Sequence, residues 1–333
     1  MAELPFVSTL IVTRNERNYI KPSLMSFINQ TYPKDRYEII VVDGGSDDGT
    51  LDIVNEIIRD YSSETFHIRL IDNPKRILAS GWNIGIQASI GEYITRIDAH
   101  AEAAPDFIEK SVNTILKVEA ICVGGRLDSI PLDGDDMLVS KVLSSSFGVG
   151  NSSFRVSDTA GYVDTAVYGL YKKTVFDEVG YFDEFLVRNQ DIDLHSRIKK
   201  AGYRFYFNPE IHSVYHTRSS VKKMVKQAFG NGKWNMVLMK KGSTALSLRH
   251  LIPFFFFTYL VLSIICGFLF WPIWVLAGGV MLLYFILGFI AGAKKVISFS
   301  ERIKMPYLFF LLHCTYGVGY YAGIFQYYDI RKK

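Results

Sequence analysis

The sequence predicts an α/β domain with a Rossmann-like, mixed and mostly parallel sheet, followed by an α-helical membrane region. Residues 1–217 alternate short β-branched runs with helical patterns, whereas residues 251–328 are dominated by uncharged apolar segments. The formal net charge of the 333-residue chain is only +4, which does not favour nucleic acid as a partner.

Strands and helices alternate through the first part of the chain. Strands are predicted over residues 7–12, 38–43, 66–71, 92–98 and 120–125. Helices are predicted around 20–28, over 50–61 and 77–90, and after Pro105. Ligands of such sheets bind at the carboxyl ends of the strands. Asp43 and Asp98, which each end a strand, are therefore expected at the functional edge.

The last part of the chain is expected in a membrane. Uncharged segments near 251–271, 272–293 and 305–328 each have about the length of a membrane-spanning helix. A tight turn at Trp271 and Pro272 is expected to join the first two at the far interface. The third is either a full span or re-entrant, because a full span would place the basic C-terminal residues outside the cell.

Residues 218–250 carry eight Lys and Arg residues and no Asp or Glu. Such a run beside apolar segments is expected to contact anionic membrane lipids, although most charge runs are only solvated helix faces. The predicted domains are 1–217 (soluble catalytic domain), 218–250 (basic interfacial helical segment) and 251–333 (transmembrane region). With no signal peptide pattern, the catalytic domain is expected on the cytoplasmic side of a multi-pass protein of the inner membrane. The three cysteines form no CxxC pair, so no zinc site or disulfide framework is expected.

Two common nucleotide-binding signatures are missing from the sequence. No GxGxxG follows the first strand, and no GxxxxGK[ST] occurs anywhere. Their absence disfavours a dinucleotide-dependent dehydrogenase and a P-loop ATPase.

The segment VVDGGSDDGT (residues 41–50) places Asp43 beside two glycines at a strand end. Its carboxylate is expected to accept hydrogen bonds from a nucleoside, and Asp47 and Asp48 are expected to be structural, near the start of the next helix.

The segment YITRIDAHA (residues 93–101) holds a second pair of polar residues. Asp98 and His100 lie two residues apart, so on a strand they face the same way, as a carboxylate and an imidazole do around a divalent metal. Mn²⁺ suits both ligands, and Mg²⁺ prefers the carboxylate. The pattern is weak by itself, and His216 joins the metal site only if the chain returns there.

Asp191, in RNQDIDLHSR (residues 188–197), has two possible roles. It is either the N-cap of the following helix or a general base that takes a proton from an acceptor hydroxyl. Asp193 is expected to be structural.

With these motifs the chain resembles the family 2 glycosyltransferases with a GT-A fold. The resemblance runs from VSTLIVTRNE through VVDGGSDDGT and NIGIQASIGEYITRIDAHA to VGYFDEFLVRNQDIDLHSRIKKAGY, about two thirds of the chain. DAHA, GVGNSSFR, VDTAVYGLYKK, and QAFGNGKW followed by LSLRHLIP resemble the succinoglycan-type exopolysaccharide branch in particular.

The resemblance implies a role for each matching residue. The nucleotide-sugar would contact Thr13, Glu16, Asp43, Asn83 and Asp98, and the metal would be held by Asp98 and His100. His216 would complete the metal site if the chain returns there. Asp191 would be the catalytic base. The acceptor-side residues would be Gln190, Gln227, Lys233 and Trp234. Gln190 replaces the usual glutamate, and the other three match the QxxRW motif only loosely.

The function expected from this resemblance is an inverting, metal-dependent transfer of a hexose from a UDP-sugar. The acceptor is expected to be a membrane-presented glycan linked to polyprenyl diphosphate, in exopolysaccharide or cell-surface glycan synthesis. Single addition is favoured over processive synthesis, because at most three spans could hardly form a channel. A catalytically inactive membrane scaffold and a membrane-attached nucleotidyltransferase are the alternatives, and the sequence defines neither the sugar nor the oligomeric state.

Overall fold

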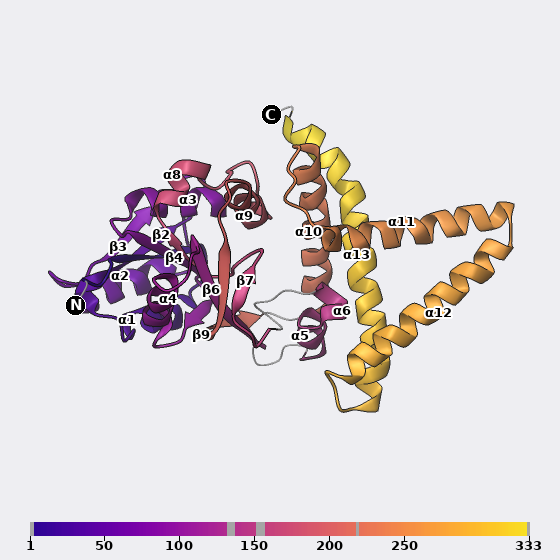
Figure 1. Ribbon diagram of the computed structural model, residues 1–333, viewed down its shortest axis with the longest axis horizontal. Coiled ribbons are helices and arrows are strands. Elements are labelled where there is room, and N and C mark those ends of the chain that lie inside the picture. Colours follow the sequence, from indigo (N-terminus) through magenta and orange to yellow (C-terminus); the bar gives the residue numbers. More distant parts are fainter. Residues whose placement is uncertain (1–2, 132–136, 151–156, 218–219, 332–333) are drawn as a thin grey trace. The chain divides into compact units, whose positions relative to one another are not determined.

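The computed structural model describes residues 3–131, 137–150, 157–217 and 220–331. The chain forms two compact units (Figure 1). The first comprises residues 1–130 and 153–216, and the second comprises residues 131–152 and 217–333. Residues 131–152 group with the second unit, and the division of the chain into domains 1–217, 218–250 and 251–333 stays a prediction.

The first unit contains one sheet and its covering helices. Its strands are β1 (Val7–Thr13), β2 (Tyr37–Asp43), β3 (Ile68–Asp72), β4 (Tyr93–Asp98), β5 (Ala101–Ala103), β6 (Cys122–Pro131), β7 (Gly161–Val163), β8 (Leu170–Lys172) and β9 (Phe205–Thr217). Its helices are α1 (Ile20–Ile28), the short 3₁₀ turn Lys34–Arg36, α2 (Thr50–Tyr61), α3 (Leu78–Ala88), α4 (Phe107–Ile115), α8 (Thr174–Val179) and α9 (Gln190–Lys200).

The sheet is mixed, as predicted. β3, β2, β1 and β4 lie side by side in parallel. Beyond β4 the order is β8, β6, β9, β5, with β7 on β9; β8 is antiparallel to β4 and β6, and β9 is antiparallel to β5 and β7. The strand predicted at 120–125 does not extend the parallel part, because β6 pairs antiparallel with β8. The parallel arrangement is therefore confined to the four strands that end near the predicted site.

A hydrophobic core covers each face of the parallel strands. Val7 and Ile11 of β1 pack in one cluster with Leu24 and Phe27 of α1. Leu10, which points the other way, packs in a second cluster with residues of α3 such as Trp82 and Ile86. The two clusters explain why β1 and β2 are buried along almost their whole length.

The second unit is helical. It contains α5 (Met137–Leu143), α6 (Ser146–Val149), α10 (Val221–Lys240), α11 (Leu248–Leu269), α12 (Pro272–Ala293) and α13 (Phe299–Arg331). Within the described residues, α11, α12 and α13 are the three helices long and apolar enough to cross a membrane. The expected turn joins α11 to α12, with Pro272 at the first position of α12. α13 is one continuous helix through Pro306, without the interruption that a re-entrant segment requires.

Candidate functional site

Three predicted residues meet at one edge of the parallel strands. In the register of the sheet, Thr13 of β1 lies opposite Asp43 of β2, and Val12 lies opposite Asp98 of β4. Thr13 and Asp43 are both buried, and the hydroxyl of Thr13 has no hydrogen-bond partner among the described residues. An unpartnered buried hydroxyl at the ligand-binding edge of such a sheet is available to a bound molecule.

The Asp43 carboxylate is already engaged by its own turn. Oδ2 accepts hydrogen bonds from the backbone N–H groups of Gly45 (2.8 Å) and Ser46 (2.9 Å), and Oδ1 accepts one from the Ser46 hydroxyl (2.5 Å). A direct contact of this carboxylate with a nucleoside must therefore share or replace those bonds. What the structure demonstrates for Asp43 is that it shapes the loop after β2.

The loop after β2 is tied to the loop after β1. Asn15, in a left-handed conformation (φ 56°), exchanges two hydrogen bonds of 2.9 Å with Asp47. Asp48 accepts hydrogen bonds from the backbone N–H groups of Arg17 and Thr50, the latter at the start of α2. Asp47 and Asp48 are therefore structural, as expected, although the N-cap of α2 is Gly49.

Asp98 is contacted by a tyrosine, and His100 by a tyrosine and a glutamate. The hydroxyl of Tyr168 donates to Asp98 Oδ2 at 2.9 Å, and Tyr168 itself has a positive φ of 45°. The rings of His100 and Tyr215 are linked by a 3.1 Å hydrogen bond, and His100 Nδ1 lies 3.2 Å from Glu16 Oε1. Glu16, which was predicted to contact the nucleotide, thus faces His100.

The chain does return to this place. The backbone N–H of His216 on β9 donates to the carbonyl oxygen of His100 at 3.2 Å. The ring of His216, however, lies 2.6 Å from Glu102 Oε1. Within the described residues, no three His, Cys, Asp or Glu side chains converge as a metal site.

The expectation that Asp98 and His100 lie on one strand is wrong, because β4 ends at Asp98 and His100 lies in the turn before β5. A carboxylate at the end of β4, an imidazole in this turn and a second imidazole on β9 nevertheless form a donor set that suits Mn²⁺. The residues therefore fit a metal in type and backbone placement, and their side chains must reorient to bind it.

Arg96 connects the strand end to the predicted base. Its guanidinium nitrogen lies 2.9 Å from Asp191 Oδ2, and the group sits 5.2 Å from the ring centroids of both Trp82 and Phe182. Arg96 and Asp98 are two residues apart on β4 and share one face, so Asp191 lies on the Asp98 side of the strand. Arg96 was not singled out from the sequence, although its spacing from Asp98 in TRID was a usable signal.

Asp191 is kept ionised by this partner. Burial opposes the charged form, but the charge and hydrogen bond of Arg96, together with His195, outweigh it and lower the pKa of Asp191 below its ordinary value. The other carboxylate oxygen, Oδ1, is buried without a partner among the described residues. The N-cap of α9 is Asn189 (φ 62°), so the alternative role of Asp191 as N-cap is wrong.

Asn83 and Gln190 differ in their hydrogen bonds. The Asn83 amide nitrogen donates to the carbonyl oxygen of Phe182 and to Glu184, and its oxygen accepts the N–H of Phe182. Asn83 therefore anchors the loop before α9, and a role in binding the nucleotide-sugar stays a prediction. Gln190 is buried, and its side-chain oxygen has no partner among the described residues.

The other acceptor-side residues lie on α10 of the second unit. Gln227 is exposed, Lys233 is half-buried and Trp234 is buried. They share one helix, and their role stays a prediction.

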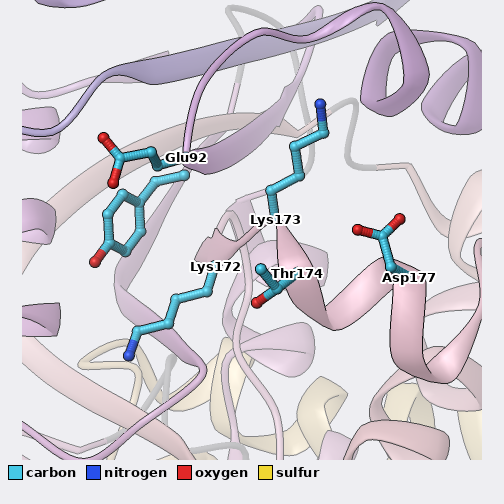
Figure 2. A pocket seen from close by; sticks show the side chains of 6 residues that line it. Glu92, Lys172, Lys173, Thr174 and Asp177 are labelled. Atoms are coloured by element: carbon cyan, nitrogen blue, oxygen red, sulfur yellow. The ribbon is translucent and has the colours of Figure 1, made fainter.

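A pocket of about 310 Å³ occurs elsewhere in the first unit. Figure 2 shows Glu92, Lys172, Lys173, Thr174 and Asp177 around it. Glu92 and Tyr93 stand at the start of β4, whereas Asp98 stands at its end. None of the predicted site residues lines this pocket.

Comparisons with known proteins agree with the fold and the motifs. The family model "Glycosyl transferase family 2" matches residues 8–180. A dolichyl N-acetyl-alpha-D-glucosaminyl phosphate 3-beta-D-2,3-diacetamido-2,3-dideoxy-beta-D-glucuronosyltransferase of Methanococcus voltae is 30% identical over 96% of this chain and 98% of its own. The succinoglycan biosynthesis protein ExoA of Rhizobium meliloti is 28% identical over 75% of this chain and 76% of its own.

A solved structure is similar over nearly the whole chain. The mannosyltransferase PcManGT of Pyrobaculum calidifontis, solved with GDP-Man and Mn²⁺, has a TM-score of 0.62 at 17% identity, covering 95% of this chain and 88% of that one. This likeness confirms the predicted GT-A fold. The family match and the full-length relative show that the chain belongs to glycosyl transferase family 2 and is a glycosyltransferase.

Proposed function

We propose that the protein transfers a sugar from a UDP-sugar, with inversion, to a lipid-linked glycan acceptor at the cytoplasmic face of a membrane. The acceptor class is supported by the archaeal relative, whose name describes a dolichyl phosphate-linked substrate, and by the apolar helices of this chain. The exopolysaccharide context is supported by the rhizobial relative.

The observation that carries the proposal is the arrangement of Asp98, Arg96 and Asp191. A carboxylate at the strand end suits the donor side, and a second, ionised carboxylate stands on the same side of β4. Asp191 Oδ1 is buried and has no partner in the part of the chain that the structure describes, which suits a group that accepts a proton from a substrate.

The proposed reaction is a direct displacement. Asp191 takes the proton of the acceptor hydroxyl while that oxygen forms a bond to the anomeric carbon of the donor. The bond between this carbon and the diphosphate oxygen breaks, and UDP leaves with the electron pair. Because attack comes from the face opposite to the leaving group, an α-linked donor gives a β-linked product.

A divalent cation, Mn²⁺ or Mg²⁺, would be held by Asp98 with His100 and His216, and it supplies positive charge that stabilises the departing diphosphate. Thr13, Glu16, Asp43 and Asn83 remain proposed donor-side residues. Gln190, Gln227, Lys233 and Trp234 remain proposed acceptor-side residues.

The test is nucleotide release by detergent-purified protein with a panel of UDP- and GDP-sugars, with and without a polyprenyl-diphosphate glycan. Asp191→Asn and Asp98→Asn are expected to lower turnover by about 100-fold or more, as loss of a general base or a phosphate-site group does. Asp177→Asn, in the pocket at the opposite end of β4, makes the same chemical change and is expected to leave turnover unchanged.

Two outcomes would contradict the proposal. Turnover of Asp191→Asn within a few-fold of the unmodified protein would remove Asp191 as the base. An α-linked product from an α-linked donor, seen by NMR of the anomeric proton, would show retention in place of inversion.

A further inference from the structure

Two of the three apolar helices of the second unit have the geometry of a membrane hairpin. α11 and α12 have 22 residues each, and at 1.5 Å per residue each is about 33 Å long, which matches the hydrocarbon core of a bilayer. Their tip is exposed, with Phe268 at 75%, Leu269 at 87% and Trp271 at 69%. In Figure 1 the two helices leave α13 and meet again at this tip.

The third helix meets the hairpin at its base. α13 contacts α11 through the rings of Phe254 and Phe257. It contacts α12 at Tyr284, Phe285, Gly288 and Gly292, all in the half of α12 that is distant from the tip. A side-chain carbon placed on Gly278 or Gly279, nearer the tip, would meet nothing within 4 Å. α13 therefore does not run along the hairpin toward its tip.

The opposite face of α13 packs on α10 at backbone distance. A side chain on Gly319 would collide with the carbonyl oxygen of Phe229, and one on Gly323 would collide with that of Lys233. The Asn235 amide on α10 donates to the hydroxyls of Tyr316 (2.8 Å) and Tyr320 (2.9 Å). The two helices therefore occupy the same environment along this contact.

That environment is not hydrocarbon, because α10 carries lysines along its whole length. Lys222, Lys223, Lys226 and Lys240 are exposed. A lysine at the centre of a bilayer costs about 3 kcal/mol, and α10 would bring several of them. An interfacial position, with the lysines at anionic headgroups, avoids this cost.

The exposed face of α13 suits an interface as well. Its exposed apolar residues are Phe299, Ile303, Tyr307, Val318, Tyr321 and Phe325, of which Phe299 also contacts α12 and Tyr321 also contacts α11. They are separated by 4, 4, 11, 3 and 4 positions, which places all of them on one side of the helix. An apolar stripe beside a basic neighbour is the pattern of a helix that lies in the headgroup region with its apolar face toward the acyl chains.

We infer that α13 lies in the plane of the cytoplasmic membrane interface, across the base of a two-span hairpin formed by α11 and α12. The surface of α10 and α13 is then the part of the protein that binds the anionic headgroups. This arrangement places the basic segments 218–250, 294–304 and 331–333 on one side of the membrane, in agreement with the distribution of basic residues in membrane proteins. It removes the conflict that a third span would create.

Cysteine labelling in intact cells tests the topology. The probe is a membrane-impermeant maleimide, used on full-length protein with Cys266→Ser and Cys314→Ser while the buried Cys122 is kept. Phe270→Cys at the tip is expected to react in intact cells. A cysteine added after Lys333 is expected to react only after lysis. Labelling of the C-terminal cysteine in intact cells would overturn the inference, because it would place the end of α13 outside.

A depth measurement tests the orientation of α13 independently. Spin labels at Ile303→Cys, Val318→Cys and Phe325→Cys, in vesicles of anionic and neutral phospholipid, are expected to report one shallow depth of roughly 5–10 Å. Leu276→Cys, in the middle of α12 and also exposed, is the matched control and is expected to be deep. A profile in which Val318 is deep while Ile303 and Phe325 are shallow would show a span and contradict the inference.

Discussion

At the scale of single residues, Arg96 links groups that lie far apart in the sequence. It contacts Trp82 before it, Phe182 and Asp191 after it, and shares a strand face with Asp98. Its charge and hydrogen bond are the main opposition to the burial that would otherwise favour a protonated Asp191. Without Arg96, only His195 opposes burial, and the pKa of Asp191 is expected to rise.

Arg96→Met is therefore expected to move the acid limb of kcat/KM to higher pH by about one unit or more, since an ion pair of this kind shifts a pKa by about 1–3 units. Turnover near neutral pH should also fall. The measurement is a pH profile of kcat/KM between pH 4 and 8.

Arg69→Met is the matched control, because it breaks another arginine–carboxylate pair, with the buried Glu38, away from the predicted site. It is expected to lower stability and leave the acid limb in place. An unchanged limb in Arg96→Met would show that Arg96 does not govern the ionisation of Asp191.

A second prediction concerns His195, which is buried between Thr165 and Tyr171 with both ring nitrogens hydrogen-bonded. Burial lowers its pKa to about 4, so the folded protein holds it neutral where the unfolded chain binds a proton. Stability should therefore fall as the pH drops from the ordinary histidine pKa of about 6.5 toward 4, by about 1.4 kcal/mol per pH unit.

Thermal unfolding of detergent-purified protein across this pH range measures the effect. His195→Gln is expected to reduce the dependence on pH, and His67→Gln, at an exposed histidine, is expected to leave it unchanged. Equal pH dependence in all three proteins would contradict the prediction.

The sequence predicted the strand-end residues better than their partners. Asp43 and Asp98 each end a short predicted strand, so their place at the sheet edge could be read from the local pattern. The spacing of Arg96 from Asp98 was visible in the same way, but the contacts of Arg96 with Asp191 and of Tyr168 with Asp98 were not, because they join residues about 95 and 70 positions apart. The orientation of His216 toward Glu102 likewise depends on side-chain contacts between strands, which no spacing encodes.

At the scale of the elements, a helix or strand could be predicted from the sequence when it was long enough to show a regular apolar pattern. α2 was predicted at its observed bounds because its apolar residues follow the helical period over three turns. β5, β7 and β8 have three residues each and are too short to show a period. β9 is long, but its sequence does not predict a strand, because it contains Pro209 and several polar residues.

The contact of α10 with α13 gives a prediction for two chemically identical changes. Gly319→Ala inserts a methyl group where the carbonyl oxygen of Phe229 already lies, so it is expected to lower stability by about 1–3 kcal/mol. Gly278→Ala adds the same group where nothing lies within 4 Å, and should be neutral or slightly stabilising because alanine favours helix.

The measurement is the thermal unfolding midpoint in detergent. Equal midpoints for the two variants would mean that α10 and α13 do not pack closely in solution.

At the scale of the whole molecule, residues 131–152 interrupt the first unit yet pack in the second. Leu138, Val139 and Val142 of α5 are buried against Met305, Phe309 and their neighbours on α13. A fragment of residues 1–217 would keep α5 and α6 without this cover, and is expected to aggregate.

Replacing residues 131–152 in that fragment by a Gly/Ser segment of equal length is expected to give a soluble monomer, as judged by size-exclusion chromatography. A soluble monomer from the unmodified fragment would show that α5 and α6 do not need α13.

The same interruption has a consequence for how the protein is made. α5 leaves the ribosome roughly 160 residues before α13 begins, which at 5–20 residues per second is a delay of about 8 to 30 seconds. During that interval the first unit can complete its sheet through β9, but its inserted segment has no partner. Nascent chains of this protein must therefore carry an unsatisfied apolar segment until α13 emerges, so the inserted segment can complete its packing only after the end of the chain has been made.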